Sequence, residues 1–393
     1  MTTVNPYAPW QVYPGKAQTS LALPDYYSNY IAYTFDAMSN PVRGMCIKGR
    51  FPNARYMSFN VYATKEGTSL GALTDYQMWG PTPQSNPFVA GNPTQNTDYT
   101  VYVLPLIQDR LPRNIPQGVQ NILYYNPNKL ERGQLTVVLR YYVPEGNEFG
   151  GVPLPTVTGY NALNGEPSGA PAPLYPNMDE QKPIFENRLR KIFETAQGDT
   201  LRFYHSVGQG QFNNADNIYL ISAVKGVVPG TNAVVLKVRP PTYPTSPDRF
   251  DQTAVRYWSI NQGNPDTSTP FGMMDSEFGQ APDGYVYVVM GGPGVEEQAR
   301  KRGYNYMPWK ANQKQAVIIY RNMLTMPQYR GSITRVPNLP TAANTPPYWD
   351  KSVLASYEAG RFLPDYAPSG QVVTEQELNK GLGGAASPGF AYS

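Results

Sequence analysis

The chain has 393 residues, of which 32 are Lys or Arg and 29 are Asp or Glu, so its formal net charge is +3. Charged residues make up 16 % of the chain, against about a quarter in an average globular protein, whereas Tyr occurs 31 times. The aromatic content excludes a solvated, disordered chain. The balanced charge, with no long basic run, argues against a surface that binds nucleic acid.

Short runs rich in Val, Ile, Thr and Tyr, bounded by Gly, Pro, Asn and Asp, dominate the chain and predict β-strands. The clearest runs are residues 55–62, 99–104, 135–143, 233–238, 255–260, 284–290 and 316–320. One helix is predicted over residues 183–197, because Phe185, Leu189 and Phe193 recur at helical spacing. A second, short helix is predicted from Thr374, where Glu377 completes a capping box.

The motifs of the first half recur in the same order in the second half. The matched pairs are RYMS at 55–58 with RYWS at 256–259, GALTD at 71–75 with GMMD at 272–275, DYTVYV at 98–103 with DGYVYV at 283–288, and VVLR at 137–140 with IIYR at 318–321. Chance is a poor explanation of a conserved order, so we expect two copies of one structural unit.

Strands with one polar face and frequent turn signals favour a sandwich or jelly roll. We therefore expect an all-β chain of two tandem jelly-roll-like antiparallel β-sandwiches with a connecting helix. The expected parts are an N-terminal arm (1–23), a first sandwich (24–151), a Pro/Gly-rich linker and helix (152–201), a second sandwich (202–340) and a C-terminal arm (341–393).

Four motifs carry a resemblance to known proteins: NARYMSFNVY at 53–62, GGVPLP at 150–155, RYWS at 256–259 and YMPW at 306–309. They resemble a family of uncharacterised bacterial proteins that are often secreted. More distantly, each half is similar to the jelly-roll modules of paired bacterial domains of unknown function. The resemblance implies the fold and an extracellular or surface location, and no particular reaction. Members often carry cysteines where this chain has Ile260 and Met274.

The counts of cysteine and histidine exclude several chemistries. Cys46 is the only cysteine and His205 the only histidine, so the chain can form no internal disulfide and no site with several Cys or His ligands. We therefore expect no metal. Ca²⁺ bound by oxygen ligands is possible, but no motif supports it. The sequence contains no run of about 18 apolar residues, so we expect no transmembrane helix. The first 20 residues lack the apolar core of a signal peptide.

The repeated Asp75 and Asp275 are the sharpest candidates for chemistry. They could act as paired carboxylates on a glycosidic bond or as Ca²⁺ ligands. Alternatively, each caps a turn or pairs with a repeated arginine, either Arg140 and Arg321 or Arg55 and Arg256. We favour the structural interpretation, because a residue kept in both copies usually serves the shared fold. His205 is a weaker catalytic candidate, since no nucleophile signature accompanies it.

Tyrosines are the remaining signal, because Tyr loses little entropy when it is ordered and is favoured at contact surfaces. The candidate binding residues are Tyr26, Tyr27, Tyr30, Tyr304, Tyr306 and Trp309. They could line a carbohydrate platform or a subunit interface.

The leading hypothesis is a non-enzymatic structural or binding protein that self-associates through Tyr- and Pro-rich surfaces and its terminal arms. One alternative is a protein that binds or acts on a glycan through Asp75 or Asp275. A second alternative is a double-jelly-roll coat protein. The expected partners are further copies of the chain and, in the first alternative, a glycan, with neither nucleic acid nor membrane insertion.

Overall fold

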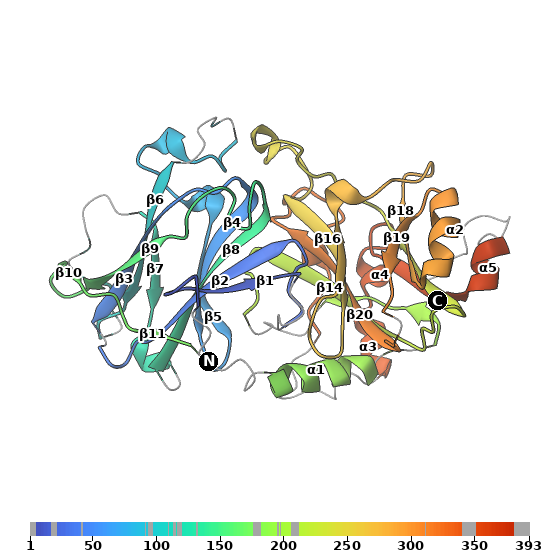
Figure 1. Cartoon of the computed structure of the whole chain (residues 1–393), viewed down its shortest axis with the longest axis horizontal. Helices are drawn as coiled ribbons and strands as arrows, with labels where there is room; N and C mark the ends of the chain where they lie inside the picture. Colours follow the sequence, from blue (N-terminus) through green and yellow to red (C-terminus); the bar gives the residue numbers. More distant parts are fainter. Residues whose placement is uncertain are drawn as a thin grey trace.

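A computed structural model of the chain describes residues 5–16, 22–40, 42–90, 92, 97–108, 110–112, 115, 120–130, 133–175, 182–194, 196, 198–205, 212–310, 312–339 and 351–380. Strands account for 41 % of the structure and helices for 16 %, so the prediction of an all-β fold is confirmed. Two β-sandwiches lie side by side along the long axis of the molecule (Figure 1).

The first sandwich consists of two sheets. One has the strand order β1-β2-β8-β4-β5, with β11 also paired to β2, and the other has the order β10-β9-β3-β6-β7. The strands are β1 (Gln11–Pro14), β2 (Ser28–Asp36), β3 (Arg43–Arg50), β4 (Ala54–Ala63), β5 (Thr68–Thr74), β6 (Asp98–Pro105), β7 (Ile122–Tyr125), β8 (Gln134–Pro144), β9 (Thr156–Asn161), β10 (Pro167–Ser168) and β11 (Pro173–Leu174).

The second sandwich repeats this arrangement. Its sheets have the orders β13-β14-β20-β16-β17 and β12-β21-β15-β18-β19. The strands are β12 (Thr200–Leu201), β13 (Tyr204–His205), β14 (Asn217–Lys225), β15 (Asn232–Val238), β16 (Tyr257–Gly263), β17 (Phe271–Met274), β18 (Val286–Gly291), β19 (Asn305–Pro308), β20 (Gln315–Met323) and β21 (Ser369–Thr374). Eight strands of each half, β2 to β9 and β14 to β21, therefore follow one topology.

One detail differs from the expected antiparallel sandwich. At one edge of each sandwich the last pair is parallel, β6 with β7 and β18 with β19. A parallel neighbour needs a crossover connection rather than a hairpin. In the second half that connection contains the short helix α2 (Glu296–Lys301).

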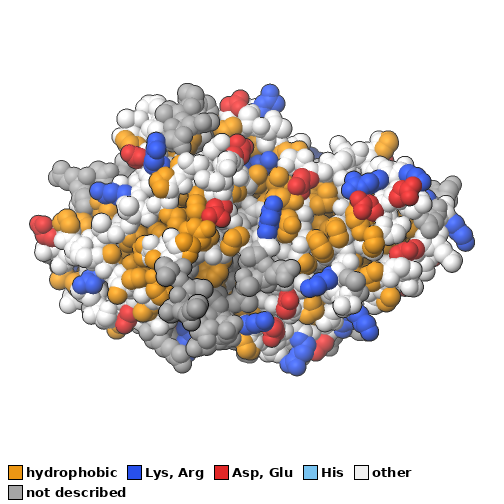
Figure 2. Space-filling view, viewed as in Figure 1, with side chains coloured by type: hydrophobic (Ala, Val, Ile, Leu, Met, Phe, Trp, Pro, Cys, Tyr) orange, Lys and Arg blue, Asp and Glu red, His pale blue; other side chains and the backbone are white. Residues whose placement is uncertain are grey.

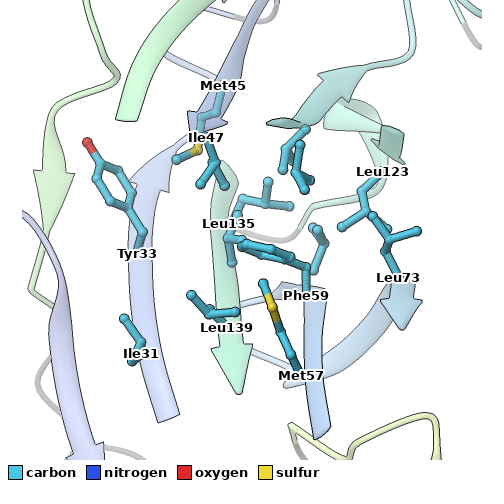
Figure 3. Packing of buried hydrophobic residues seen from close by; sticks show 14 of the residues in the cluster. Ile31, Tyr33, Met45, Ile47, Met57, Phe59, Leu73, Leu123, Leu135 and Leu139 are labelled. Atoms are coloured by element: carbon cyan, nitrogen blue, oxygen red, sulfur yellow. The ribbon is translucent and has the colours of Figure 1, made fainter. Parts of the chain in front are cut away.

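Alternation along the strands builds the core of each sandwich. In β8, Leu135, Val137, Leu139 and Tyr141 belong to the first core, whereas Arg140 between them points to the opposite face of the sheet. Figure 3 shows Leu135 and Leu139 packed with Phe59, Ile31 and other apolar side chains from both sheets of the first sandwich. The second core is built in the same way, with Trp258, Ile260, Ile318 and Tyr320 at its centre.

Helices cover parts of the second sandwich. Helix α1 (Lys182–Glu194) places Leu189 and Phe193 against Ile221 and Ile319, as the helical spacing predicts. Helices α2 and α5 (Glu375–Lys380) cover the outer face of the sheet that contains β15, with Leu378 fully buried there. In the described residues the other α-helices are α3 (Lys351–Tyr357) and α4 (Ala359–Phe362). The capping box predicted at Thr374 and Glu377 is present and starts α5.

The boundaries of the sandwiches extend beyond the expected ones. The expected linker supplies β9 to β11, because β9 pairs with β3 and β11 with β2. The expected C-terminal arm supplies β21, which pairs with β15 along six residues. The expected N-terminal arm supplies β1 and the fully buried Trp10. These segments complete the edges of sheets in their own chain, so their described parts are not free arms.

Candidate functional site

The candidate residues meet at one place, which we call the seam: the contact between the outer faces of the sheets that contain β8 and β20. Alternate residues of both strands supply it, with Arg140 on β8 and Arg321 on β20. Both guanidinium groups are almost completely buried. A buried arginine needs partners for its charge and its five N–H groups.

Asp75 and Asp275 lie at the edge of the seam, each at the start of a 3-10 helix, Asp75–Gln77 or Asp275–Glu277. Each carboxylate accepts a backbone N–H from the neighbouring strand, Asp75 from Met57 at 2.8 Å and Asp275 from Trp258 at 3.1 Å. Neither is exposed to solvent by more than 2 %.

The arginine partners of these two aspartates come from the opposite sandwich. Arg256 lies 3.2 and 3.3 Å from the two carboxylate oxygens of Asp75. Arg55 pairs with Asp275 in the reverse direction. Of the two arginine pairs weighed from the sequence, Arg55 and Arg256 are therefore the partners, and each crosses the seam.

Burial dominates the acidity of both aspartates. Loss of solvent raises the pKa of Asp75 to about 6, against the opposing effect of Arg256 and the Met57 N–H. Burial also raises the pKa of Asp275, with Arg55 opposing. Since both carboxylates are enclosed and occupied by arginine, this geometry offers no open pair of carboxylates for general acid–base chemistry on a glycosidic bond.

Arg140 and Arg321 bind other groups. Arg321 Nη2 donates to the Leu23 carbonyl at 2.6 Å, and Arg140 Nη2 donates to the Phe212 carbonyl at 2.7 Å. Leu23 and Phe212 precede β2 and β14 respectively and share a φ of 54°. A positive φ is costly for residues of this size. That both copies adopt it shows that the two halves approach each other in the same way.

Asp25 is a residue of the seam that the sequence analysis did not single out. It is fully buried and accepts hydrogen bonds from Tyr257 at 2.7 Å and Ser259 at 2.6 Å in the second sandwich. At the repeat-related place, Tyr56 of the first sandwich donates to Asn214 at 3.0 Å. The available signal was spacing: Asp25 lies five residues before Tyr30, and Asn214 lies five residues before Tyr219.

The tyrosines near the N-terminus are used inside the chain. The backbone N–H of Tyr26 donates to Asn261, the Tyr27 hydroxyl donates to the Gly272 carbonyl and bonds to Glu277, and the Tyr30 hydroxyl accepts the Asp25 N–H. These contacts place the tyrosines between the two sandwiches of one molecule.

The candidates in the second half are separated from the seam. Tyr304 stacks on Tyr287 with ring centroids 4.7 Å apart, and Tyr306 donates to the Gly291 carbonyl at 3.0 Å. Trp309 is buried and donates to the Gln313 carbonyl. Tyr304 and Tyr306 are only partly buried, whereas Trp309 belongs to the second core.

His205 lies in β13, where its Nδ1 is 2.8 Å from the Val336 carbonyl. Burial lowers the pKa of His205. Cys46 is buried as a free thiol on β3. No cluster of three or more His, Cys, Asp or Glu residues that could hold a metal occurs among the residues that the structure describes.

Within the described part of the chain, no helix combines the length and the apolar character needed to cross a membrane.

No protein-family model matches, and no curated protein matches. Among solved structures, the chain is similar to the VPA0106 protein from Vibrio parahaemolyticus, with a TM-score of 0.44 and 11 % identity over 89 % of each chain. A second similarity, to an anti-sigma factor domain-containing protein, has a TM-score of 0.19 and 7 % identity over 79 % of each chain.

Proposed function

We propose that the chain is a non-enzymatic structural or binding protein that associates with further copies of itself. The observation that carries the proposal is the use of Asp75 and Asp275: both carboxylates are buried and bound to arginines of the opposite sandwich. Residues held in this way join the two halves and have no free position for a substrate.

Exposed aromatic side chains supply the surface for association. Tyr76 and Trp79, one and four residues after Asp75, are each 47 % exposed. Figure 2 shows hydrophobic side chains gathered across the middle of one face of the molecule, with charged side chains scattered among and around them. Large apolar groups that stay exposed in contiguous areas mark interaction sites. Self-association through the surface around Tyr76 and Trp79 does not need the terminal arms, because the described parts of these arms complete the sheets of their own chain.

Size-exclusion chromatography with light scattering tests the proposal. We expect the full chain to form a defined oligomer at micromolar concentration, and the double variant Tyr76→Ser, Trp79→Ser to dissociate. Tyr175→Ser, at a tyrosine that is 51 % exposed after β11, is the matched control and should leave the oligomer intact. A wild-type chain that stays monomeric contradicts the proposal. Electron microscopy of the same sample separates filaments from the shells of a coat protein.

A second candidate function, glycan binding, is favoured by a row of tyrosines on the second sandwich. Lys237 Nζ lies 3.9 Å from the centroid of the Tyr285 ring, beside the stacked Tyr287 and Tyr304. Aromatic rings flanked by a cation and by Asp283 suit the apolar faces and hydroxyls of a sugar. A glycan array with wild type, Tyr304→Ala and the distant control Tyr76→Ala tests this; binding that Tyr304→Ala retains counts against it.

A further inference from the structure

The two arginines at the centre of the seam occupy repeat-related positions. Arg140 is paired across β2 with Tyr30 and across β4 with Ser58. Arg321 is paired across β14 with Tyr219 and across β16 with Ser259. Their exposures are 1 % and 4 %, so each carries a positive charge that is shielded from water.

We call the surroundings of Arg140 the first site and those of Arg321 the second site. In the second site the charge of the arginine is neutralised by a carboxylate. Asp25 Oδ2 lies 3.5 Å from Arg321 Nε, 2.6 Å from the Ser259 hydroxyl and 3.4 Å from Asn261 Nδ2. The set of an arginine, a serine and an asparagine thus forms a binding site for one negative charge.

In the first site the same donors recur, but a neutral residue takes the place of Asp25. Asn214 Oδ1 accepts hydrogen bonds from the Tyr56 hydroxyl and the backbone N–H of Asp216. In the same way, Asp25 Oδ1 accepts from the Tyr257 hydroxyl and the backbone N–H of Tyr27. Ser58 and Asn60 correspond to Ser259 and Asn261, and both pairs are joined by the same amide-to-hydroxyl bond, at 2.9 and 2.8 Å.

Several buried polar atoms in the first site have no hydrogen-bond partner among the described residues. They are Arg140 Nε, Arg140 Nη1, Asn214 Nδ2 and Asn60 Oδ1. A nearby acid, Asp216, is bound by the hydroxyls of Tyr56 and Thr74. The rings of Tyr30 and Tyr62 each lie 5.5 Å from the guanidinium carbon and offset its charge in part.

We propose that the first sandwich binds a small monovalent anion of the halide class between Arg140 and Asn214. An uncompensated buried charge is costly, and buried N–H donors require acceptors. The unpaired Nε, Nη1 and Nδ2 groups provide three donors for one ion. A single-atom anion suits a site whose donors, Arg140 and Asn214, are exposed by no more than 2 % and in which the Asn214 amide takes the place of a carboxylate group.

Thermal unfolding of the full chain tests this proposal, which is independent of the proposed function. We expect Tm to rise by about 2–4 °C when sodium gluconate is replaced by sodium chloride at constant ionic strength, because the anion binds only the folded state. Asn214→Asp supplies the missing charge internally and should abolish the chloride effect. Ala215→Asp adds the same charge at an exposed neighbouring position and should retain it.

Anomalous diffraction from crystals grown in sodium bromide locates the ion directly. We expect a bromide peak within hydrogen-bonding distance of Arg140 in the wild type and none at this place in Asn214→Asp. A wild type without that peak overturns the proposal. A chloride effect on Tm that is equal in wild type and Asn214→Asp overturns it as well.

Discussion

Arg256 of the second sandwich contacts both carboxylate oxygens of Asp75 in the first, at 3.2 and 3.3 Å. The pair of Arg55 with Asp275 repeats this relationship in the opposite direction. Because each sandwich supplies the counter-charge for a buried group of the other, the two halves form one unit whose contact resembles that of a two-fold dimer.

Replacing Arg256 with Ala should therefore be strongly destabilising. At pH 7 we expect a loss of about 3–5 kcal/mol in the free energy of unfolding, because Asp75 is left as an unpaired buried carboxylate. Urea unfolding measures the loss. Arg300→Ala, which removes an exposed i,i+4 pair with Glu296 on α2, is the control and should cost less than about 0.5 kcal/mol. Equal effects of the two substitutions would show that the seam does not depend on this ion pair.

The raised pKa of Asp75 predicts a pH dependence of stability. Its pKa is about 6 in the folded chain, against 3.8 for an ordinary aspartate such as that of the unfolded chain. The folded state therefore binds more protons than the unfolded state between these two pH values. Stability from this group is therefore present at low pH and is lost as pH rises to about 6, by roughly 3 kcal/mol in total.

The Asp75→Asn variant has no titrating group at this position. It should therefore lack the part of the pH dependence of the unfolding free energy that Asp75 contributes. Unfolding free energies of wild type and variant, measured from about pH 4 to pH 7, provide the test. We expect their difference to change between about pH 4 and pH 6 and to level off above the folded-state pKa of about 6. A difference that is constant with pH would mean that Asp75 stays ionised throughout.

Much of the architecture could be predicted from local sequence. The period-two alternation and the repeated motifs predict two sandwiches, and the spacing of Phe185, Leu189 and Phe193 predicts α1. The segments assigned to linker and arms were harder to predict. Strands such as β11, of two residues, and β21, with Gly370 in it, have little pattern of their own and form because a sheet edge is available.

The seam could be predicted only in part. The repeated motifs indicate Asp75, Asp275 and the arginines as partners. They do not tell whether each aspartate pairs with the arginine of its own half or with that of the other half, because both arrangements give the same repeats. The crossing of the pairs is a property of how the sandwiches dock. Asp25 and Asn214 differ in identity, so a search for identical repeated residues passes over them although their places correspond.

Gly272 on β17 allows the N-terminal segment to approach the second sandwich. A Cβ built there would lie 2.5 Å from Tyr26 Cβ and 2.6 Å from Asn261 Oδ1. Gly272→Ala should displace the Tyr26 backbone and weaken its bond to Asn261, with a fall in Tm of several degrees. Gly279→Ala, where the nearest atom would be 3.6 Å away, is the control and should change Tm little. Differential scanning calorimetry of both variants decides whether this approach is as close as the structure indicates.

Leu378 tests whether the C-terminal segment is part of the second sandwich in solution. Its side chain is fully buried on α5, against the sheet face that contains Val235, Val289 and Val373. Leu378→Ala should cost about 2–5 kcal/mol, because it removes buried methyl groups and leaves a cavity over the sheet. Gln376→Ala, at an exposed position of the same helix, should be nearly neutral. If the segment were instead a detached arm, neither substitution would change the urea midpoint.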